Sequence, residues 1–144
     1  MTHPLVDLPD GAIPVVAAVA QREGRFLVAR RGPGVRHAGS WEFPGGKLRP
    51  GEDLAAGAQR ELMEELALEV DAVGRLRYRA RDPGSLYLIL FVDVVVRGEP
   101  TLREHEAVGW KSPRELSRLP LAPCDARFVR ESLLSTSPSS PPPG

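Results

Sequence analysis

Three closely spaced glutamates, Glu61, Glu64 and Glu65, have the residue type and spacing that most directly suggest chemistry in this sequence. On a helix that turns about 100° per residue, they fall within one arc that borders an apolar stripe. Carboxylate oxygens are the preferred ligands of hard cations such as Mg²⁺ or Mn²⁺. A solvated helix face is the alternative, although such a face usually contains lysine or arginine among its acids. The run therefore indicates a metal site, with the solvated face left open.

The segment before the glutamates is a glycine-rich loop that contains Gly45, Gly46, Lys47 and then Pro50-Gly51. Glycine permits a sharp turn and lets backbone amides approach a ligand closely. Such amides, together with Lys47, can contact phosphate oxygens while nearby carboxylates hold a metal. The loop and the acidic helix together predict a site for a metal-bound polyphosphate.

The spacing of these residues forms a longer pattern. It consists of Gly46, five residues, Glu52, seven residues, Arg60-Glu61-Leu62, one residue and Glu64-Glu65. This pattern closely resembles the signature box of the Nudix hydrolases, the MutT-type pyrophosphohydrolases. That family has a glycine after the acidic run, where this chain has Ala67. The difference concerns the backbone at the end of the helix and involves no metal ligand.

The resemblance implies a role for each matching residue. Hydrolysis of a phosphoanhydride requires that the phosphate oxygens be neutralised and that one water be oriented and activated. Glu52 is expected to bind the metal through water or to stabilise the loop, and Arg60 to pair with a box carboxylate. The expected cofactor is Mg²⁺, with Mn²⁺ as a substitute. The candidate metal ligands are Gly46, Glu61, Glu64, Glu65 and Glu104.

A further acid is expected from the opposite side of the cleft, and Glu104 and Glu106 are the candidates. MutT-like sequences place a metal-binding glutamate six residues before a tryptophan such as Trp110, which favours Glu104. An ordinary acidic loop is the alternative for this segment. None of the histidines is assigned to a metal, because His3, His37 and His105 do not cluster in the sequence.

The nucleotide is expected to contact residues outside the box as well. Residues 41–47 resemble the MutT branch, which implies that Arg31 lies at the phosphates and Phe43 at the base. Residues 121–125 resemble the CTP pyrophosphohydrolase branch, which has Asp where MutT has Asn. An ionised Asp125 only accepts hydrogen bonds, and so suits an exocyclic amino group or a ring N–H; capping the last helix is its alternative role. The candidate substrate-binding residues are Arg31, Phe43, Gly45, Gly46, Lys47 and Asp125.

These residues must be positioned by both strands and helices. Strands are expected at 13–20, 25–29, 70–80, 86–96 and 107–111 from apolar or alternating patterns. Helices are expected after Asp53 as N-cap, after Ser112 in a capping box, and at about 126–134. The elements follow no regular βαβ order, which predicts an α/β/α sandwich with a mixed central sheet. The Nudix fold has this architecture.

The whole chain limits the remaining function classes. Its 144 residues suit one domain, with a flexible lead at 1–11, a Nudix domain at 12–134 and a disordered Ser/Pro-rich tail at 135–144. Nineteen basic and nineteen acidic residues argue against a general nucleic-acid binder. The single cysteine, Cys124, excludes an internal disulfide and suits the cytoplasm. The longest apolar run is too short to span a membrane.

The sequence therefore predicts a cytoplasmic, Mg²⁺-dependent nucleoside triphosphate pyrophosphohydrolase, either a monomer or a homodimer. Its products are a nucleoside monophosphate and pyrophosphate, and its substrate is 8-oxo-dGTP or a cytidine-type triphosphate. The expected role is cleansing of the nucleotide pool or regulation of a nucleotide's level. The alternatives are a Nudix hydrolase of a sugar nucleotide or dinucleotide, and a Nudix-like module that senses a nucleotide without cleaving it. The box carboxylates, which such a module is expected to lose, are all present.

Overall fold

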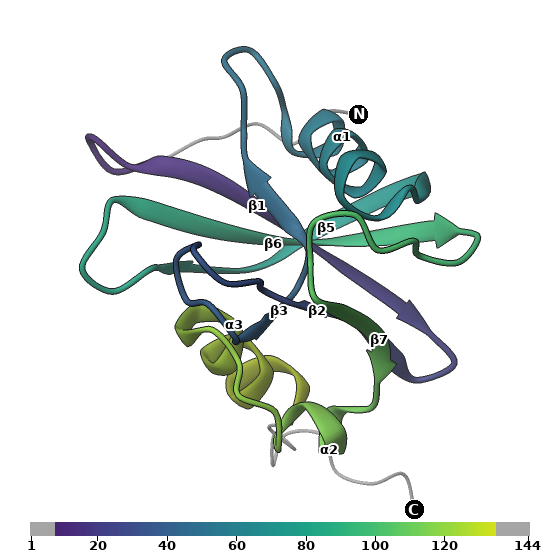
Figure 1. The fold of residues 1–144 in the computed structure, drawn as a ribbon. Helices are drawn as coiled ribbons and strands as arrows, with labels where there is room; N and C mark the ends of the chain where they lie inside the picture. Colours follow the sequence, from purple (N-terminus) through teal and green to yellow (C-terminus); the bar gives the residue numbers. More distant parts are fainter. Residues whose placement is uncertain (1–7, 135–144) are drawn as a thin grey trace, which may run out of the picture.

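The structure is a computed structural model that describes residues 8–134, and Figure 1 shows its arrangement. The strands are β1 (Ile13–Arg22), β2 (Arg25–Arg30), β3 (Trp41–Glu42), β4 (Gly45–Lys47), β5 (Glu69–Arg81), β6 (Tyr87–Arg97) and β7 (Ala107–Lys111). The helical segments are α1 (Leu54–Leu66), α2 (Pro113–Leu116), α3 (Pro123–Phe128) and a π-helical turn, η1 (Val129–Leu133).

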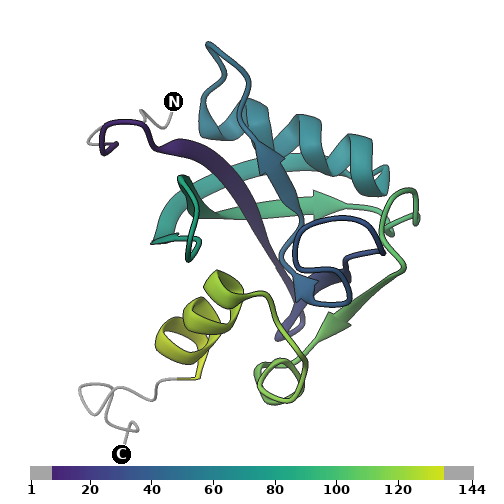
Figure 2. The same ribbon diagram turned by 60° about the vertical axis from the view of Figure 1, so that its left-hand side comes forward.

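The strands form one mixed sheet in the order β3-β2-β1-β6-β5, with β4 beside β1 and β7 beside β2. The central pair, β1 and β6, is parallel, whereas the other named pairs are antiparallel. Helix α1 lies on one side of the sheet and α3 on the other, as the two views in Figures 1 and 2 show. The predicted α/β/α arrangement with a mixed sheet is confirmed.

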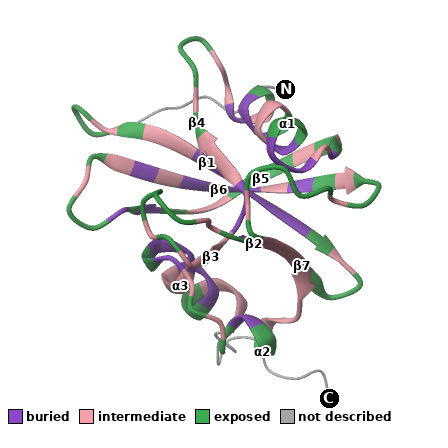
Figure 3. Ribbon diagram, viewed as in Figure 1, coloured by how far each residue is buried: buried purple, intermediate pink, exposed green. Residues whose placement is uncertain are grey.

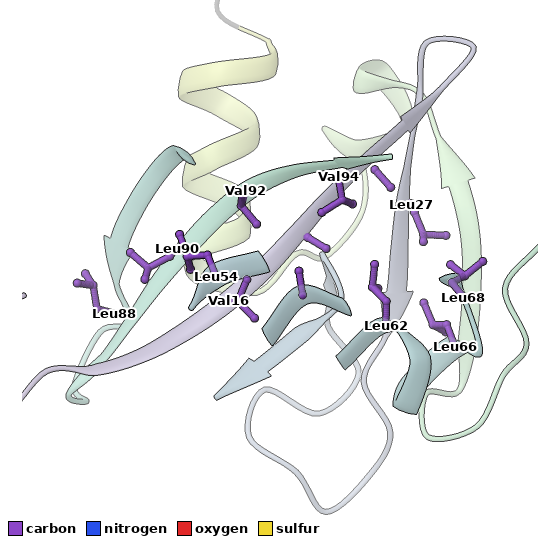
Figure 4. Close-up of a cluster of buried hydrophobic side chains, with 13 residues drawn as sticks. Val16, Leu27, Leu54, Leu62, Leu66, Leu68, Leu88, Leu90, Val92 and Val94 are labelled. Carbon is purple, nitrogen blue, oxygen red and sulfur yellow. The ribbon is translucent and has the colours of Figure 1, made fainter. Parts of the chain in front are cut away.

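One core lies between α1 and the sheet. Leu54, Ala58, Leu62 and Leu66 recur every four residues along α1, and all are buried against strands β1, β2 and β6. Figure 4 shows Leu54, Leu62 and Leu66 directed toward the sheet, and Val92 of β6 belongs to the same cluster. This packing gives α1 one fixed rotation, so its acidic residues take defined positions beside the core.

The second core lies between the sheet and α3, and it is aromatic. Phe91 of β6 stacks on Phe128 of α3 at 4.5 Å between ring centroids, and Phe43 meets Phe128 edge to face at 5.3 Å. Figure 3 shows buried residues along the middle of the central strands and exposed residues at the tips of most loops. Both faces of the sheet are therefore covered, and the loops at its edge remain available for a site.

Most of the expected elements appear, with three differences. The last helix begins at Pro123 and not near residue 126, because proline suits the first helical position. It then continues into the π-helical turn η1. The segment around the glycine-rich loop, expected as loop, contains the short strands β3 and β4. A β-carbon on Gly45 would collide with the carbonyl oxygen of Val16, so this glycine lets β4 pair closely with β1.

The helix caps predicted at Asp53 and Ser112 are confirmed. The carboxylate of Asp53 accepts a hydrogen bond from the backbone N–H of Ala56 at 2.8 Å. Ser112 and Glu115 form a complete capping box at the start of α2. Most of the expected flexible lead and the whole expected Ser/Pro-rich tail lie outside the described residues. Within residues 8–134, no helix is both long enough and apolar enough to cross a membrane.

Candidate functional site

A cavity of about 440 Å³ opens beside strands β1, β4 and β6. The loop after β2, the loop before β7 and the start of α3 form its other walls. Eight of the predicted site residues line it: Arg31, Phe43, Gly45, Gly46, Lys47, Glu65, Glu104 and Asp125. The remaining four do not line it: Glu52, Arg60, Glu61 and Glu64. The structure therefore brings together most of the predicted residues, which come from widely separated segments.

Glu65 is the box carboxylate that reaches the cavity, and only 7% of the residue is exposed. Burial, together with the adjacent carboxylates of Glu61, Glu42 and Glu104, raises the pKa of Glu65 from 4.5 to about 10. Its Oε1 atom is buried and has no hydrogen-bond partner among the described residues. A buried carboxylate surrounded by other acids is costly unless a cation neutralises it. The environment of Glu65 thus fits a divalent metal ion.

Arg60 organises the carboxylates on the outer side of the box. Its Nε and Nη2 atoms donate to the two oxygens of Glu52 at 2.6 and 2.8 Å. Its Nη1 atom lies 3.2 Å from an oxygen of Glu61 and 3.2 Å from an oxygen of Glu64. The bond to Arg60 lowers the pKa of Glu52 from 4.5 to about 2. The predicted pairing of Arg60 with a box carboxylate is confirmed.

Glu52 connects the glycine-rich loop to helix α1. Besides its contacts with Arg60, its Oε1 atom accepts a hydrogen bond from the backbone N–H of Arg49 at 2.8 Å. Arg60 in turn donates to the carbonyl oxygen of Lys47 at 3.0 Å. These bonds hold the loop against the helix, which matches the loop-stabilising alternative predicted for Glu52.

The metal assignment itself stays a prediction. Within the described chain, no three His, Cys, Asp or Glu side chains are arranged as a ready-made metal cluster. Two box carboxylates, Glu61 and Glu64, instead contact Arg60. The unpartnered oxygen of Glu65 and the all-oxygen donor set still match what Mg²⁺ requires. The residues that would supply it are Gly46, Glu61, Glu64, Glu65 and Glu104.

Two residues of the site had no role assigned from the sequence, Glu42 and His105. The Oε1 atom of Glu42 accepts from Nη1 of Arg31 at 2.6 Å, and its Oε2 atom lies 2.9 Å from Nε2 of His105. The side chain of His105 is 7% exposed, and its Nε2 atom lies 3.9 Å from Oε1 of Glu65. Glu42 therefore lies between the predicted phosphate ligand and the predicted metal ligand.

The sequence contains a signal for the direction in which the Glu42 side chain points. Glu42 stands between Trp41 and Phe43, and side chains alternate between the two faces along an extended segment. Both aromatic residues pack against the second core, so Glu42 must point the other way. For His105 no comparable signal exists, because its burial depends on contacts with residues far away in the sequence.

Asp125 lies in the wall of the cavity with 6% of the residue exposed. Its Oδ2 atom accepts a hydrogen bond from the backbone N–H of Phe43 at 2.8 Å. Burial, reinforced by the charge of Glu42, raises its pKa well above the ordinary value. The alternative role as a helix cap is wrong, because Ala122 is the N-cap residue of α3 and Asp125 follows in the first turn.

The other candidate residues differ in how they lie relative to the cavity. Glu104 lines the cavity, whereas Glu106 does not and lies 3.5 Å from Arg30. The ring of Phe43 belongs to the aromatic core and the residue is 2% exposed, so a base could meet only a small part of it. The ammonium group of Lys47 lies 5.3 Å from the ring centroid of Tyr87, at the rim of the cavity.

Comparison with known proteins agrees with this geometry. The NUDIX domain family model matches residues 12–132. The chain is 38% identical to CTP pyrophosphohydrolase of Escherichia coli over 115 residues, which cover 78% of this chain and 85% of that protein. It is also 38% identical to putative 8-oxo-dGTP diphosphatase 2 of Mycobacterium tuberculosis over 120 residues, or 81% and 85% of the two chains.

The fold has matching solved structures as well. The crystal structure of MutT NUDIX hydrolase from Burkholderia pseudomallei superposes with a TM-score of 0.74 at 25% identity. That match covers 85% of this chain and 99% of the other. Sequence pattern, fold and relatives agree, and the chain therefore belongs to the Nudix hydrolase family.

Proposed function

We propose that this protein is a Mg²⁺-dependent nucleoside triphosphate pyrophosphohydrolase, which converts a nucleoside triphosphate and water to the monophosphate and pyrophosphate. One observation carries the proposal: a single cavity connects Glu65, whose buried Oε1 atom has no hydrogen-bond partner among the described residues, with the buried Asp125. Glu65 suits a metal-bound polyphosphate, and Asp125 suits the polar edge of a base. A nucleoside triphosphate has both groups in one molecule.

The residues around Glu65 would carry out the chemistry. Bound Mg²⁺ would neutralise the phosphate oxygens and lower the pKa of the attacking water. Arg60 holds Glu61 and Glu64 beside the glycine-rich loop, which limits the movement needed to reach the metal. Arg31 and Lys47 line the cavity and would contact the phosphates, and Glu42 keeps Arg31 in place through its 2.6 Å bond.

The base is proposed to be 8-oxoguanine or cytosine. Asp125 supports this proposal, since its position in the cavity wall lets it read hydrogen-bonding groups of a base. The names of the two relatives at 38% identity point to the same two substrates. A cytoplasmic enzyme of this kind would remove damaged or surplus nucleotides from the precursor pool.

The test is a substrate panel with product identification. The purified protein is incubated in Mg²⁺ with 8-oxo-dGTP, dGTP, CTP, dCTP, a nucleoside diphosphate sugar and a dinucleoside polyphosphate. Release of pyrophosphate and monophosphate from 8-oxo-dGTP or CTP supports the proposal. Preferred cleavage of the sugar nucleotide or dinucleotide would contradict it, and binding without cleavage of any compound would indicate a sensing module.

A further inference from the structure

The loop between β2 and β3, residues 31–40, forms one wall of the cavity. Among its residues Arg31, Pro33, Val35, Arg36 and His37 line the space into which the nucleotide is proposed to bind. Within the loop, the backbone N–H of Arg31 donates to the carbonyl of Ser40 at 2.8 Å, and the N–H of Gly39 donates to the carbonyl of Arg31 at 2.9 Å. The loop therefore closes on itself at its base, and the N–H of Ser40 also donates to the carbonyl of His37 at 3.1 Å. These backbone bonds leave the side chains of Arg36 and His37 available for contacts outside the loop.

The far end of the loop is held by Asp82, which lies in the turn between β5 and β6. The Oδ2 atom of Asp82 accepts from Nε of Arg36 at 2.6 Å, and its Oδ1 atom lies 3.1 Å from Nε2 of His37. Arg36 also donates to the carbonyl oxygen of Pro83 at 3.0 Å. Asp82 is 5% exposed, so its carboxylate is shielded from water, although the Arg36 side chain that it binds is half-exposed. The loop is thereby tied across the cavity to a different part of the sheet.

The backbone of His37, which contacts Asp82, has an unusual conformation. His37 has a φ of 57°, in the left-handed region that residues other than glycine rarely adopt. Such a conformation persists only where the surrounding contacts favour it. The side-chain contact with Asp82 is one contact that favours it, and the backbone bond from Ser40 to the carbonyl of His37 is another.

The tie to Asp82 continues to Arg31. The Nε atom of Arg31 donates to the carbonyl oxygen of Arg36, and its Nη1 atom donates to Glu42 at 2.6 Å. Two contacts therefore orient the guanidinium group of Arg31. One is with the carboxylate of Glu42 in β3, and the other is with the backbone of Arg36, whose side chain binds Asp82. Loss of the Asp82 contact would free the second of these supports.

We propose that Asp82 is a positioning residue, which acts through Arg36 and His37 to hold the 31–40 loop over the cavity and Arg31 in its phosphate-binding orientation. The inference rests on the proposed function only for the identity of the ligand. Asp82 lies outside the signature box, and its side chain contacts Arg36, His37 and Ser85. Its expected effect is on nucleotide binding and not on the chemical step.

A turn-forming role for Asp82 is the competing explanation. The side chain of Asp82 accepts a weak hydrogen bond from the hydroxyl of Ser85 at 3.4 Å, whereas its backbone carbonyl accepts from the same hydroxyl at 2.9 Å. The turn is therefore closed chiefly by the backbone. The two shorter side-chain contacts cross to the loop, which is what a positioning role requires.

The first part of the test needs no substrate. Amide hydrogen exchange is compared between the parent, Asp82→Asn and Arg36→Met, since the arginine side chain is half-exposed and its replacement carries little risk to folding. Faster exchange across residues 31–40, with the rest of the sheet unchanged, supports the proposal. Unchanged exchange in the loop for both variants would overturn it. The matched control is Asp93→Asn, whose carboxylate pairs with Arg77 at 3.3 Å away from the cavity.

The second part measures steady-state kinetics with CTP and 8-oxo-dGTP. If the untied loop is correctly placed about one tenth of the time, KM rises about tenfold while kcat changes little. Asp93→Asn should leave both constants at the parent values. In an Arg31→Ala background, Asp82→Asn should have little further effect on KM, because the residue through which it acts is absent. A parent KM in Asp82→Asn, or full additivity with Arg31→Ala, would overturn the positioning role.

The proposed function and the positioning role of Asp82 can be refuted separately. Absence of turnover by the parent on every compound of the panel would refute the proposed function. The exchange experiment would still decide whether Asp82 holds the loop. A loss of kcat at constant KM in Asp82→Asn would place the residue in the chemical step and contradict a role in positioning.

Discussion

The carboxylate of Glu61 occupies the space that a β-carbon on Gly46 would need. Gly46 lies on β4 and pairs with Val16 of β1, so its backbone cannot move away without disturbing the sheet. Glu61 projects from the neighbouring helix toward this gap. The glycine of the signature box therefore does more than permit a turn, since it allows a charged helix residue to approach the edge of the cavity.

Gly46→Ala is expected to displace Glu61 and to lower kcat/KM by about a hundredfold or more, the size of effect seen when a charged group of an active site is misplaced. Gly109→Ala serves as the control, because its β-carbon would meet only the flexible end of the Lys111 side chain at 3.3 Å. Kinetics of both variants give the comparison. Equal activity of Gly46→Ala and the parent would show that the position of Glu61 is unimportant.

Glu61→Gln and Glu64→Gln should each remove most turnover and leave the fold intact. Each replacement keeps the shape of the side chain but removes a charge that the metal would require. Loss of the charge on Glu61 also relieves its repulsion with Glu65, four residues later on the helix. Turnover at saturating Mg²⁺ and the melting temperature are measured together. Glu69→Gln, at an exposed acid just beyond α1, is the control; near-parental activity of a box variant would remove that residue from the metal site.

The metal-free protein is expected to lose stability as the pH rises. Because the pKa of Glu65 is raised from 4.5 to about 10 in the fold, the folded state retains a proton that the unfolded state releases within that range. The free energy of unfolding therefore falls with increasing pH across it. Thermal unfolding in a chelator, at several pH values, should show a shallower dependence for Glu65→Gln than for the parent. The same dependence of thermal stability on pH in Glu65→Gln and the parent would contradict the buried, protonated state of Glu65.

Ala67→Gly should stabilise the protein. Ala67 ends α1 with a φ of 56°, a left-handed conformation in which an ordinary side chain costs about 1 kcal/mol or more and glycine costs nothing. After allowing for the greater freedom of glycine in the unfolded chain, a gain of about 0.5 kcal/mol is expected. Ala56→Gly, at an exposed position inside the helix, should instead destabilise by about 0.5–1 kcal/mol. Urea unfolding measures both, and a loss in Ala67→Gly would refute the backbone argument.

Asp125→Asn should change the ranking of substrates. The amide can still accept from the backbone of Phe43 through its oxygen, but its NH₂ group only donates, where the parent has a second carboxyl oxygen that can also accept. A mismatched polar contact costs on the order of 1–3 kcal/mol, or about tenfold to a hundredfold in specificity. The measurement is kcat/KM for 8-oxo-dGTP, dGTP, CTP and dCTP. A uniform change across all four would exclude Asp125 from base recognition.

Local sequence patterns determined much of this protein. The four-residue repeat of α1 marks its buried face, and the acids beside that face follow from helix geometry alone. Asp53 and Ser112 mark helix starts because their side chains satisfy free N–H groups within a few residues. Family membership was also visible, since the box depends on spacing within one short segment. All of these features depend on neighbours along the chain.

Contacts between distant segments were decided only by the tertiary structure. Glu42 meets His105 across 63 positions of the chain, and Arg36 meets Asp82 across 46. The short strands β3 and β4 also depend on partners elsewhere, because isolated segments of two or three residues have no stable pairing of their own. The same holds for the high pKa of Glu65, which arises when folding places its carboxylate among other acids and away from water. Sequence periodicity records the environment along one element, whereas burial and charge at the site arise where several elements meet.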